Sequence, residues 1–203
     1  MISLRKGLAI VAGLALWISV DVYRPLDHDL RQFDPITVGR LETRLWRSYT
    51  DHERLKLFLD LTTLLRTQYG MPFWRSNLAA FQAARAALSF QGSDYPSTIP
   101  PLRTFFALLQ RSSSTQFRSD EAAALELEWW IIHRERDWRP AWQLESALAR
   151  LQAELYGLPA SSFAEHARRR TEAMHVRDGG GDWARIEDLL VKSWTSLHQQ
   201  VSR

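Results

Sequence analysis

The pattern of hydrophobic and polar positions divides the chain into one uninterrupted apolar run and a long remainder with helical spacing. Residues 7–20 (GLAIVAGLALWISV) carry no charge and follow Arg5 and Lys6. As a helix this run rises only about 21 Å, which is short of the roughly 30 Å hydrocarbon core of a bilayer. Extended to residues 4–23, the helix spans that core, and the basic pair reaches one headgroup layer. The pattern predicts a single transmembrane helix that contacts the lipid bilayer through residues 4–23.

A cleaved signal peptide is the alternative, because the lengths of the basic and apolar parts suit one. Cleavage requires small residues shortly after the apolar run, whereas Val20, Val22 and Tyr23 are large. We therefore expect an uncleaved anchor over residues 1–24 and an all-helical body over residues 25–203. The basic residues before the run favour a cytoplasmic N-terminus, so the body is expected outside the cytoplasm.

Apolar residues at helical spacing continue through the body, and start and stop signals separate the helices. The first helix begins at Asp34–Pro35, and we expect it to run to Tyr69 with a bend near Thr50. The others are predicted over residues 72–91, 100–110, 120–136, 140–157, 162–178 and 182–201. No strand-like alternation and no repeat period appears in the sequence. The predicted fold is all-α: an irregular bundle of about seven helices preceded by the transmembrane helix.

The composition excludes several classes of protein without identifying an activity. Hydrophobic residues make up 45% and charged residues 24% of the chain, as in an ordinary globular domain. The absence of cysteine rules out disulfides, thiolate metal sites and cysteine nucleophiles. The net charge is only +3 and the basic residues form no stripe, so no nucleic-acid partner is predicted. No phosphate-binding loop and no G-x-S-x-G turn is present in the sequence, and the chain is not expected to be an enzyme of those classes.

Acidic side chains lie among apolar ones on two of the predicted helices. On the first they share a face with Trp46, and on the 120–136 helix they interrupt a surface that is apolar at nearly every angle. Such a helix is expected at the centre of the bundle, where a carboxylate must be paired, hydrogen-bonded or protonated. The predicted buried polar network consists of Glu42, Glu53, Glu126, Glu128 and His133. Its expected partners are Arg40, Arg44, Arg47, Arg75, Arg134 and Arg136.

A metal site is the alternative use of these carboxylates and histidines. A di-metal site of the ferritin-like kind needs two Glu-x-x-His pairs on different helices, and only Glu172 and His175 have that spacing. A mononuclear site of His52, Glu126 and His133 is no better supported, because nothing in the sequence brings these residues together. No metal, cofactor or catalytic residue is predicted.

Most of the nine tryptophans fall at helical apolar positions, where large rings fill the core. Two others flank Pro140 at a helix junction and predict a contact surface for a partner. Three consecutive arginines form a basic run, which is expected to be solvated and able to contact anionic lipid or an acidic partner. The predicted interaction residues are Trp138, Trp142, Arg168, Arg169 and Arg170.

Four aromatic and charged segments resemble those of an uncharacterised family of small bacterial membrane-anchored helical proteins with no assigned activity. They are LETRLWRSYTDHERLKLF, QYGMPFWRS, LELEWWIIHRER and EHARRRTEAMHVRD. The resemblance covers nearly the whole chain and implies a single-pass protein of the bacterial inner membrane, with its body on the periplasmic side. The resemblance implies no catalytic or binding residues.

The sequence therefore favours a membrane-anchored accessory or scaffold protein, because it combines an anchor with a helical body and lacks catalytic motifs. Such a protein would be a non-catalytic subunit or partner of a membrane protein complex. The alternative is a carboxylate/histidine metal-binding protein or enzyme that uses the acidic residues of the bundle.

Overall fold

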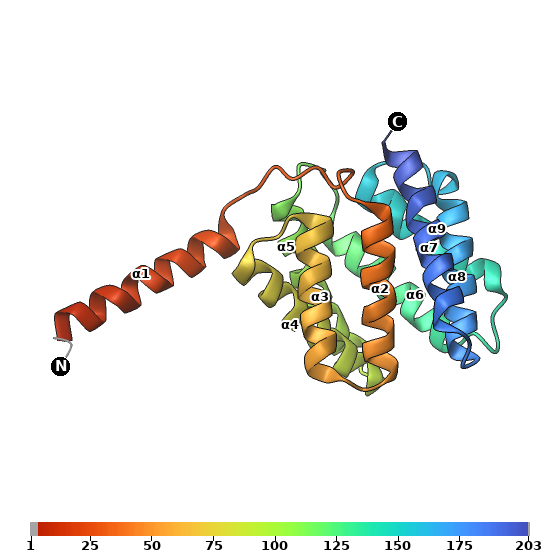
Figure 1. The fold of residues 1–203 in the computed structure, drawn as a ribbon, viewed down its shortest axis with the longest axis horizontal. Helices are drawn as coiled ribbons and strands as arrows, with labels where there is room; N and C mark the ends of the chain where they lie inside the picture. Colours follow the sequence, from red (N-terminus) through yellow and green to blue (C-terminus); the bar gives the residue numbers. More distant parts are fainter. Residues whose placement is uncertain (1–3, 203) are drawn as a thin grey trace.

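A computed structural model describes residues 4–202, which are all-helical (Figure 1). The helices of this range are α1 (Leu4–Tyr23), α2 (Pro35–Thr50), α3 (Arg54–Tyr69), α4 (Phe73–Gln91), α5 (Tyr95–Ser112), α6 (Ser119–Arg134), α7 (Ala141–Tyr156), the short 3₁₀ helix η1 (Ala160–Phe163), α8 (Ala164–Asp178) and α9 (Trp183–Val201). The prediction of an all-α bundle is confirmed.

Local signals in the sequence set several helix ends. The Asp34 carboxylate accepts a hydrogen bond from the Thr37 backbone N–H at 2.9 Å and caps α2, and Asp182 caps α9 in the same way. Helices α3 and α7 end at Gly70 and Gly157, whose φ angles of 59° and 68° lie in the left-handed region that glycine adopts without strain.

The predicted continuous helix from Pro35 to Tyr69 is wrong, because the chain reverses at residues 51–53. His52 has a φ of 58°, and the Glu53 backbone N–H bonds back to the Ser48 carbonyl oxygen at 2.9 Å. The two halves, α2 and α3, pack against each other as a helical hairpin. Neither glycine nor proline marks the turn. The apolar spacing runs on across it because both helices face the same core, and the body therefore has eight α-helices in the described range.

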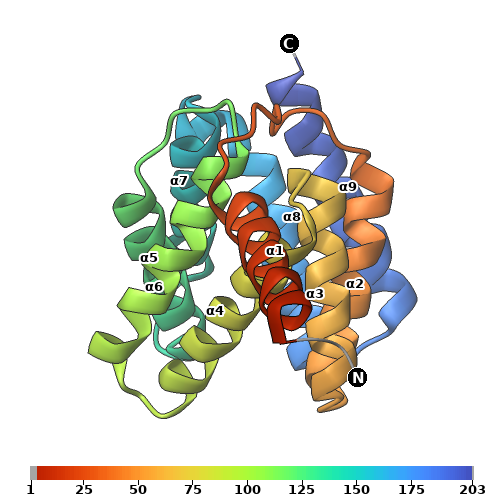
Figure 2. The same cartoon turned by 90° about the vertical axis from the view of Figure 1, so that its left-hand side faces the viewer.

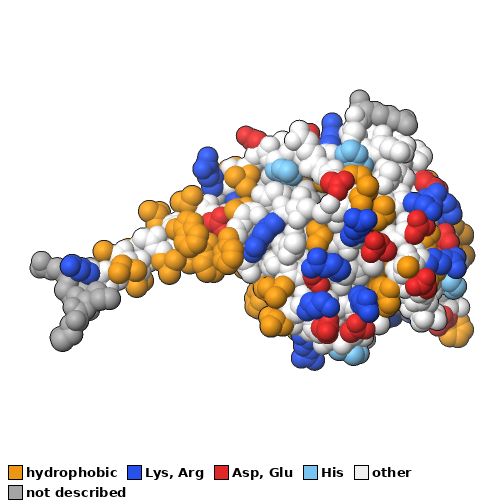
Figure 3. All heavy atoms as spheres, viewed as in Figure 1, with side chains coloured by type: hydrophobic (Ala, Val, Ile, Leu, Met, Phe, Trp, Pro, Cys, Tyr) orange, Lys and Arg blue, Asp and Glu red, His pale blue; other side chains and the backbone are white. Residues whose placement is uncertain are grey.

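Helix α1 points away from the body, and only its C-terminal part contacts it (Figures 1 and 2). The Trp17 ring meets the Trp74 ring edge-on at 5.7 Å, and the Asp21 carboxylate accepts a hydrogen bond from the Trp74 backbone N–H. Hydrophobic side chains are exposed along the rest of α1 (Figure 3). Within residues 4–202, the 6–23 span is the one helix that is long and apolar enough to cross a membrane, and 6% of it is buried. It is therefore not a core helix of the body.

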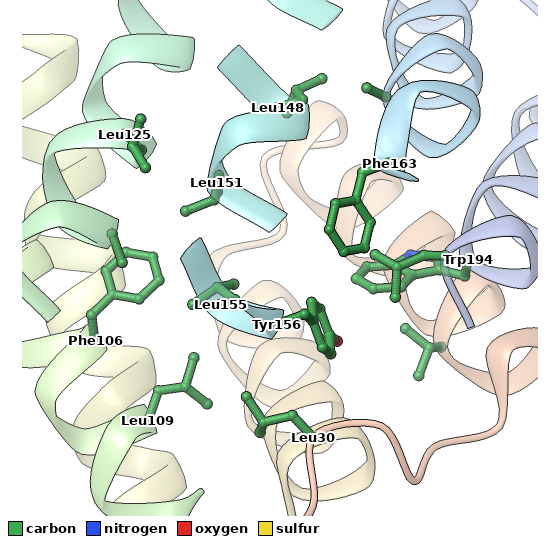
Figure 4. Close-up of a cluster of buried hydrophobic side chains, with 14 of the residues drawn as sticks. Leu30, Phe106, Leu109, Leu125, Leu148, Leu151, Leu155, Tyr156, Phe163 and Trp194 are labelled. Atoms are coloured by element: carbon green, nitrogen blue, oxygen red, sulfur yellow. The ribbon is translucent and has the colours of Figure 1, made fainter. Parts of the chain in front are cut away.

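The core of the body surrounds α7 (Figure 4). In this view α7 lies between the side chains of α5 and α6 on one side and Phe163 and Trp194 on the other, and its Tyr156 ring approaches Phe163. The expectation that the 120–136 helix is central is wrong. Helix α6 packs on α5 and α7 with one face and leaves Ala124 exposed on the other.

Helices α2 and α9 approach very closely at Gly39. A Cβ atom at this position would lie 2.7 Å from the Val191 Cα atom, which is closer than a real contact allows. Glycine is therefore required at this crossing, and the close approach brings the polar side chains of α2 and α9 within reach of each other.

Candidate functional site

Glu42 is the centre of a buried polar cluster between α2, α8 and α9. Its side chain is 5% exposed and forms an ion pair with Arg170 of α8 at 2.6 Å. Its second oxygen accepts a hydrogen bond from the Trp194 indole N–H of α9, also at 2.6 Å. Both carboxylate oxygens of Glu42 thus accept hydrogen bonds from helices that are distant in the sequence. Glu42 therefore links three helices, α2, α8 and α9.

His166 extends this cluster on α8. Its Nδ1 lies 2.8 Å from the Ser193 hydroxyl, and its ring packs edge-on against Trp194 at 5.1 Å. Burial lowers the pKa of His166 from 6.5 to about 3, and the positive charge of Arg170 acts in the same direction. The imidazole is therefore neutral at physiological pH.

Glu126 approaches the cluster from α6. The Trp130 indole N–H donates a hydrogen bond to Glu126 Oε1 at 2.9 Å. Burial raises the pKa of Glu126, and this effect is opposed by the tryptophan N–H groups and by Arg170. Burial likewise raises the pKa of Tyr69, against the influence of Arg170. The centre of the body therefore places one arginine, Arg170, near the carboxyl groups of both Glu42 and Glu126.

A second polar cluster lies at the surface, where α6 and α8 end. Asp178 bonds to His133 Nε2 at 2.9 Å and to Arg177 at 2.7 Å, while Arg136 lies 3.3 Å away. Although burial raises the pKa of Asp178, the hydrogen bonds from His133 and Arg177 outweigh it and lower the pKa to about 2. An open surface hollow adjoins this cluster and is lined by Tyr49, Thr50, His52, Gln91, Arg177 and Asp178. His133 therefore belongs to a surface cluster, separate from Glu42.

Two carboxylates of the predicted buried network lie at the surface instead. Glu53 stands before α3 and pairs with Lys56 at 2.8 Å, with both side chains about half exposed. The prediction that Glu53 shares a helix face with Glu42 assumed one continuous helix. The turn at residues 51–53 interrupts that helix, so the two residues no longer share a face. Glu128 pairs with Arg150 at 2.5 Å and is 41% exposed. It lies about 200° around α6 from Glu126, so the two cannot share a buried face.

The basic run does not form one solvated face. Arg168 and Arg169 pair with Glu165 at 2.9 and 2.5 Å near the surface, whereas Arg170 turns inward and is 15% exposed. Consecutive helical residues point about 100° apart, which explains the split. Arg170 was missing from the expected partners of Glu42, because a run of like charges on a polar helix gives no sign of which member points inward.

Trp138 and Trp142 lie uncovered at the junction of α6 and α7. They are 89% and 64% exposed, whereas Trp46 and Trp194 are buried and several others pack partly against the core. The neighbouring Arg139 is held by Glu135 at 2.6 Å and by Gln143 at 3.1 Å. The junction therefore presents two large aromatic rings beside an arginine of fixed orientation.

Among residues 4–202, no group of three His, Asp or Glu side chains is arranged to hold a metal ion. Comparison with models of protein families, with curated proteins and with solved structures finds no match. The resemblance to a family of bacterial membrane-anchored proteins stays a prediction.

Proposed function

We propose that this protein is a membrane-anchored accessory or scaffold protein, which holds a helical body at the surface of a bacterial inner membrane and presents it to a protein partner there. In this proposal α1 crosses the bilayer, the body lies on the periplasmic side, and the tryptophan pair at the α6–α7 junction is the contact surface. The partner is a subunit of a membrane protein complex.

The exposed apolar surface of α1 is the observation that carries the proposal. Its side chains include Leu8, Ile10, Val11 and Leu16, each more than 60% exposed. Soluble proteins rarely leave a continuous apolar patch of more than a few hundred Å² uncovered. A helix of twenty residues is long enough to span a hydrocarbon core, and insertion there would cover the exposed apolar side chains of α1.

The position of the tryptophan pair supports a contact role. The α6–α7 connection lies on the side of the body opposite the departing α1 (Figure 1). Trp138 and Trp142 would therefore face away from the bilayer, where a soluble part of a partner can reach them. Tryptophan and arginine are the residues that most often dominate binding energy in protein interfaces.

Membrane extraction of the full-length chain tests the anchor. We expect the protein to remain in the membrane fraction after carbonate washing, with its N-terminal residues intact by mass spectrometry. A soluble chain that starts near residue 24 would show a cleaved signal peptide and would refute the proposal.

Photo-crosslinking tests the contact surface. A photoreactive amino acid in place of Trp142 should give one dominant crosslinked protein from native membranes, whereas the same group at the exposed position Thr104 of α5 should not. The additional change Trp138→Ala should abolish the crosslink without altering the melting temperature. Equal crosslinking from both positions would contradict a specific surface.

A further inference from the structure

Helices α3 and α4 carry an exposed surface that is both apolar and basic, on the side of the body from which α1 departs. The exposed apolar residues, here called the α3–α4 surface, are Leu55, Leu59, Phe73, Phe81 and Leu88, and each is more than half exposed. Viewed along α1, helices α3 and α4 lie on the near face of the body beside it (Figure 2). Hydrophobic side chains gather on this side of the molecule in Figure 3.

The helical register of α4 turns this surface toward the same side as α1. Trp74, Phe81 and Leu88 follow one another at intervals of seven residues, or about two turns, so they share a face of α4. Trp74 is the residue that contacts Trp17 of α1. The exposed Phe81 and Leu88 therefore continue, along α4, the face on which α1 is docked.

Basic residues outnumber acidic ones in the region of α3 and α4. Residues 54–91 contain five basic residues and a single acidic one, although the whole chain is nearly balanced with 26 basic and 23 acidic residues. Of the five, Arg75 is buried and Lys56 is paired with Glu53, which leaves Arg54, Arg66 and Arg85 to define the charge of the surface. The acidic residue, Asp60, is 2% exposed and is bound by Arg44 at 2.5 Å. The exposed part of α3 and α4 is consequently basic, without an exposed carboxylate of its own.

Two arginines of the surface lie against its phenylalanines. The Arg66 guanidinium lies 4.8 Å from the centre of the Phe73 ring, and that of Arg85 lies 6.0 Å from the centre of the Phe81 ring. An aromatic ring with an arginine over it suits the boundary between acyl chains and headgroups, because the ring enters the apolar layer while the charge stays with the phosphates.

We propose that the α3–α4 surface is a second membrane contact, which rests on anionic lipid headgroups beside α1. The proposal depends on the proposed function in one respect, namely that α1 spans the bilayer. Anionic lipid suits the surface better than a second copy of this chain, because two such surfaces would bring like charges together. Insertion of α1 would keep the α3–α4 surface close to the lipid headgroups. Even weak contacts between this surface and the headgroups would then keep the body against the membrane.

Fluorescence quenching in vesicles tests the contact, and the absence of cysteine makes labelling simple. The full-length chain, reconstituted with phosphatidylcholine and phosphatidylglycerol, carries an environment-sensitive fluorophore on Phe81→Cys or, as a control, on Ser146→Cys. Nitroxide-headgroup lipid should quench the label at position 81 strongly and the label at position 146 weakly. Equal quenching at both positions, in a chain that resists carbonate, would refute the proposal.

Charge reversal tests the role of anionic lipid. Each of Arg66→Glu and Arg85→Glu removes a positive charge and adds a negative one. Either change should therefore reduce the ratio of membrane-contacting to non-contacting bodies by roughly 25-fold, since each charge near an anionic surface contributes roughly fivefold. Arg185→Glu, at an exposed position of α9, is the matched control and should leave quenching unchanged. Replacement of all lipid by phosphatidylcholine should weaken quenching similarly. If neither arginine substitution and no change in lipid charge altered the quenching, the assignment of the α3–α4 surface as a contact for anionic lipid would be overturned.

The same samples distinguish a failure of this proposal from a failure of the proposal that α1 is a membrane anchor. A chain extracted by carbonate whose label at position 81 is still quenched would refute the anchor and assign the membrane contact to the α3–α4 surface alone. An extracted chain without quenching would refute both proposals.

Discussion

Removing Glu42 is expected to destabilise the body more than any change at its surface. In Glu42→Ala, the Arg170 guanidinium and the Trp194 indole N–H lose their acceptor while both stay inside the protein. Loss of one member of a buried ion pair costs about 3–5 kcal/mol, because the other charge is left uncompensated. Since the Arg170 side chain retains 15% exposure, we expect the lower end of this range, about 3 kcal/mol.

This free energy corresponds to a clear change in melting temperature. For a domain of this size, 1 kcal/mol lowers Tm by roughly 2–4 °C, so Glu42→Ala should melt roughly 6–12 °C below the parent. Thermal unfolding of the full-length chain in mild detergent, followed by circular dichroism at 222 nm (roughly the helical minimum), measures the difference. The double change Glu42→Ala with Arg170→Ala should cost less than the sum of the single changes, because the stranded charge is then absent.

Arg40→Ala is the matched control. It breaks the ion pair between Arg40 and Glu187 at 3.4 Å, which joins the same helices, α2 and α9, but is 65% and 45% exposed. Such a pair contributes about 0–1 kcal/mol. If Glu42→Ala melted within about 1 kcal/mol of Arg40→Ala, the ion pair between Glu42 and Arg170 would not be a significant tie between the helices.

Three further predictions concern the interior of the body. Glu126→Ala should lower the free energy of unfolding by about 1–3 kcal/mol, and Glu128→Ala by no more than about 1 kcal/mol, in denaturant titrations; equal effects would contradict the buried position of Glu126. His166 has a folded-state pKa of about 3 against 6.5 when unfolded, so the stability that it provides is complete above pH 6.5 and is lost as the pH falls toward 3. The loss should approach about 1.4 kcal/mol per pH unit between these values, and His166→Gln should flatten that slope. Gly39→Ala should cost about 1–3 kcal/mol because its Cβ meets the backbone of α9, whereas Gly13→Ala, with no atom within 4 Å, should leave the melting of the body unchanged.

The sequence predicted several helix ends correctly from local signals, but not the start of α5, which begins at Tyr95 and has the expected start, Pro100, in its interior. Asp34 with Pro35, Gly157 and Asp182 each act within one turn of the backbone, and their effect does not depend on the rest of the fold. The turn at residues 51–53 could not be predicted in this way. His52 adopts its left-handed conformation without a glycine, and the packing of α3 against α2, including the bond from Ser48 to Asp60 at 2.9 Å, compensates for the strain.

Within the candidate site, the sequence identified which side chains are unusual but not which of them meet. Glu42 and Glu126 were selected because a carboxylate on an apolar face needs a partner, and that argument is local. Arg170 became the partner of Glu42 through the packing of α8 on α9 and of α9 on α2, which no periodicity encodes. The partner of Glu126 is Trp130, on its own helix. Glu53 was misplaced by the same kind of long-range effect, since one turn changed the face of every residue after it.

The buried Arg75 connects the exit of α1 to the body. Its side chain is fully buried and donates hydrogen bonds to the Arg24 carbonyl oxygen, just after α1, and to the Ser112 hydroxyl of α5 at 2.9 Å. A guanidinium is stable in such a position only while these acceptors surround it. Lifting the segment after α1 from the body would expose or strand this charge, so Arg75 favours one relative orientation of α1 and the body. In the proposed membrane arrangement, that orientation would decide which surface meets the bilayer, and it would therefore link the anchor, the α3–α4 surface and the outward position of the tryptophan pair in a single geometry.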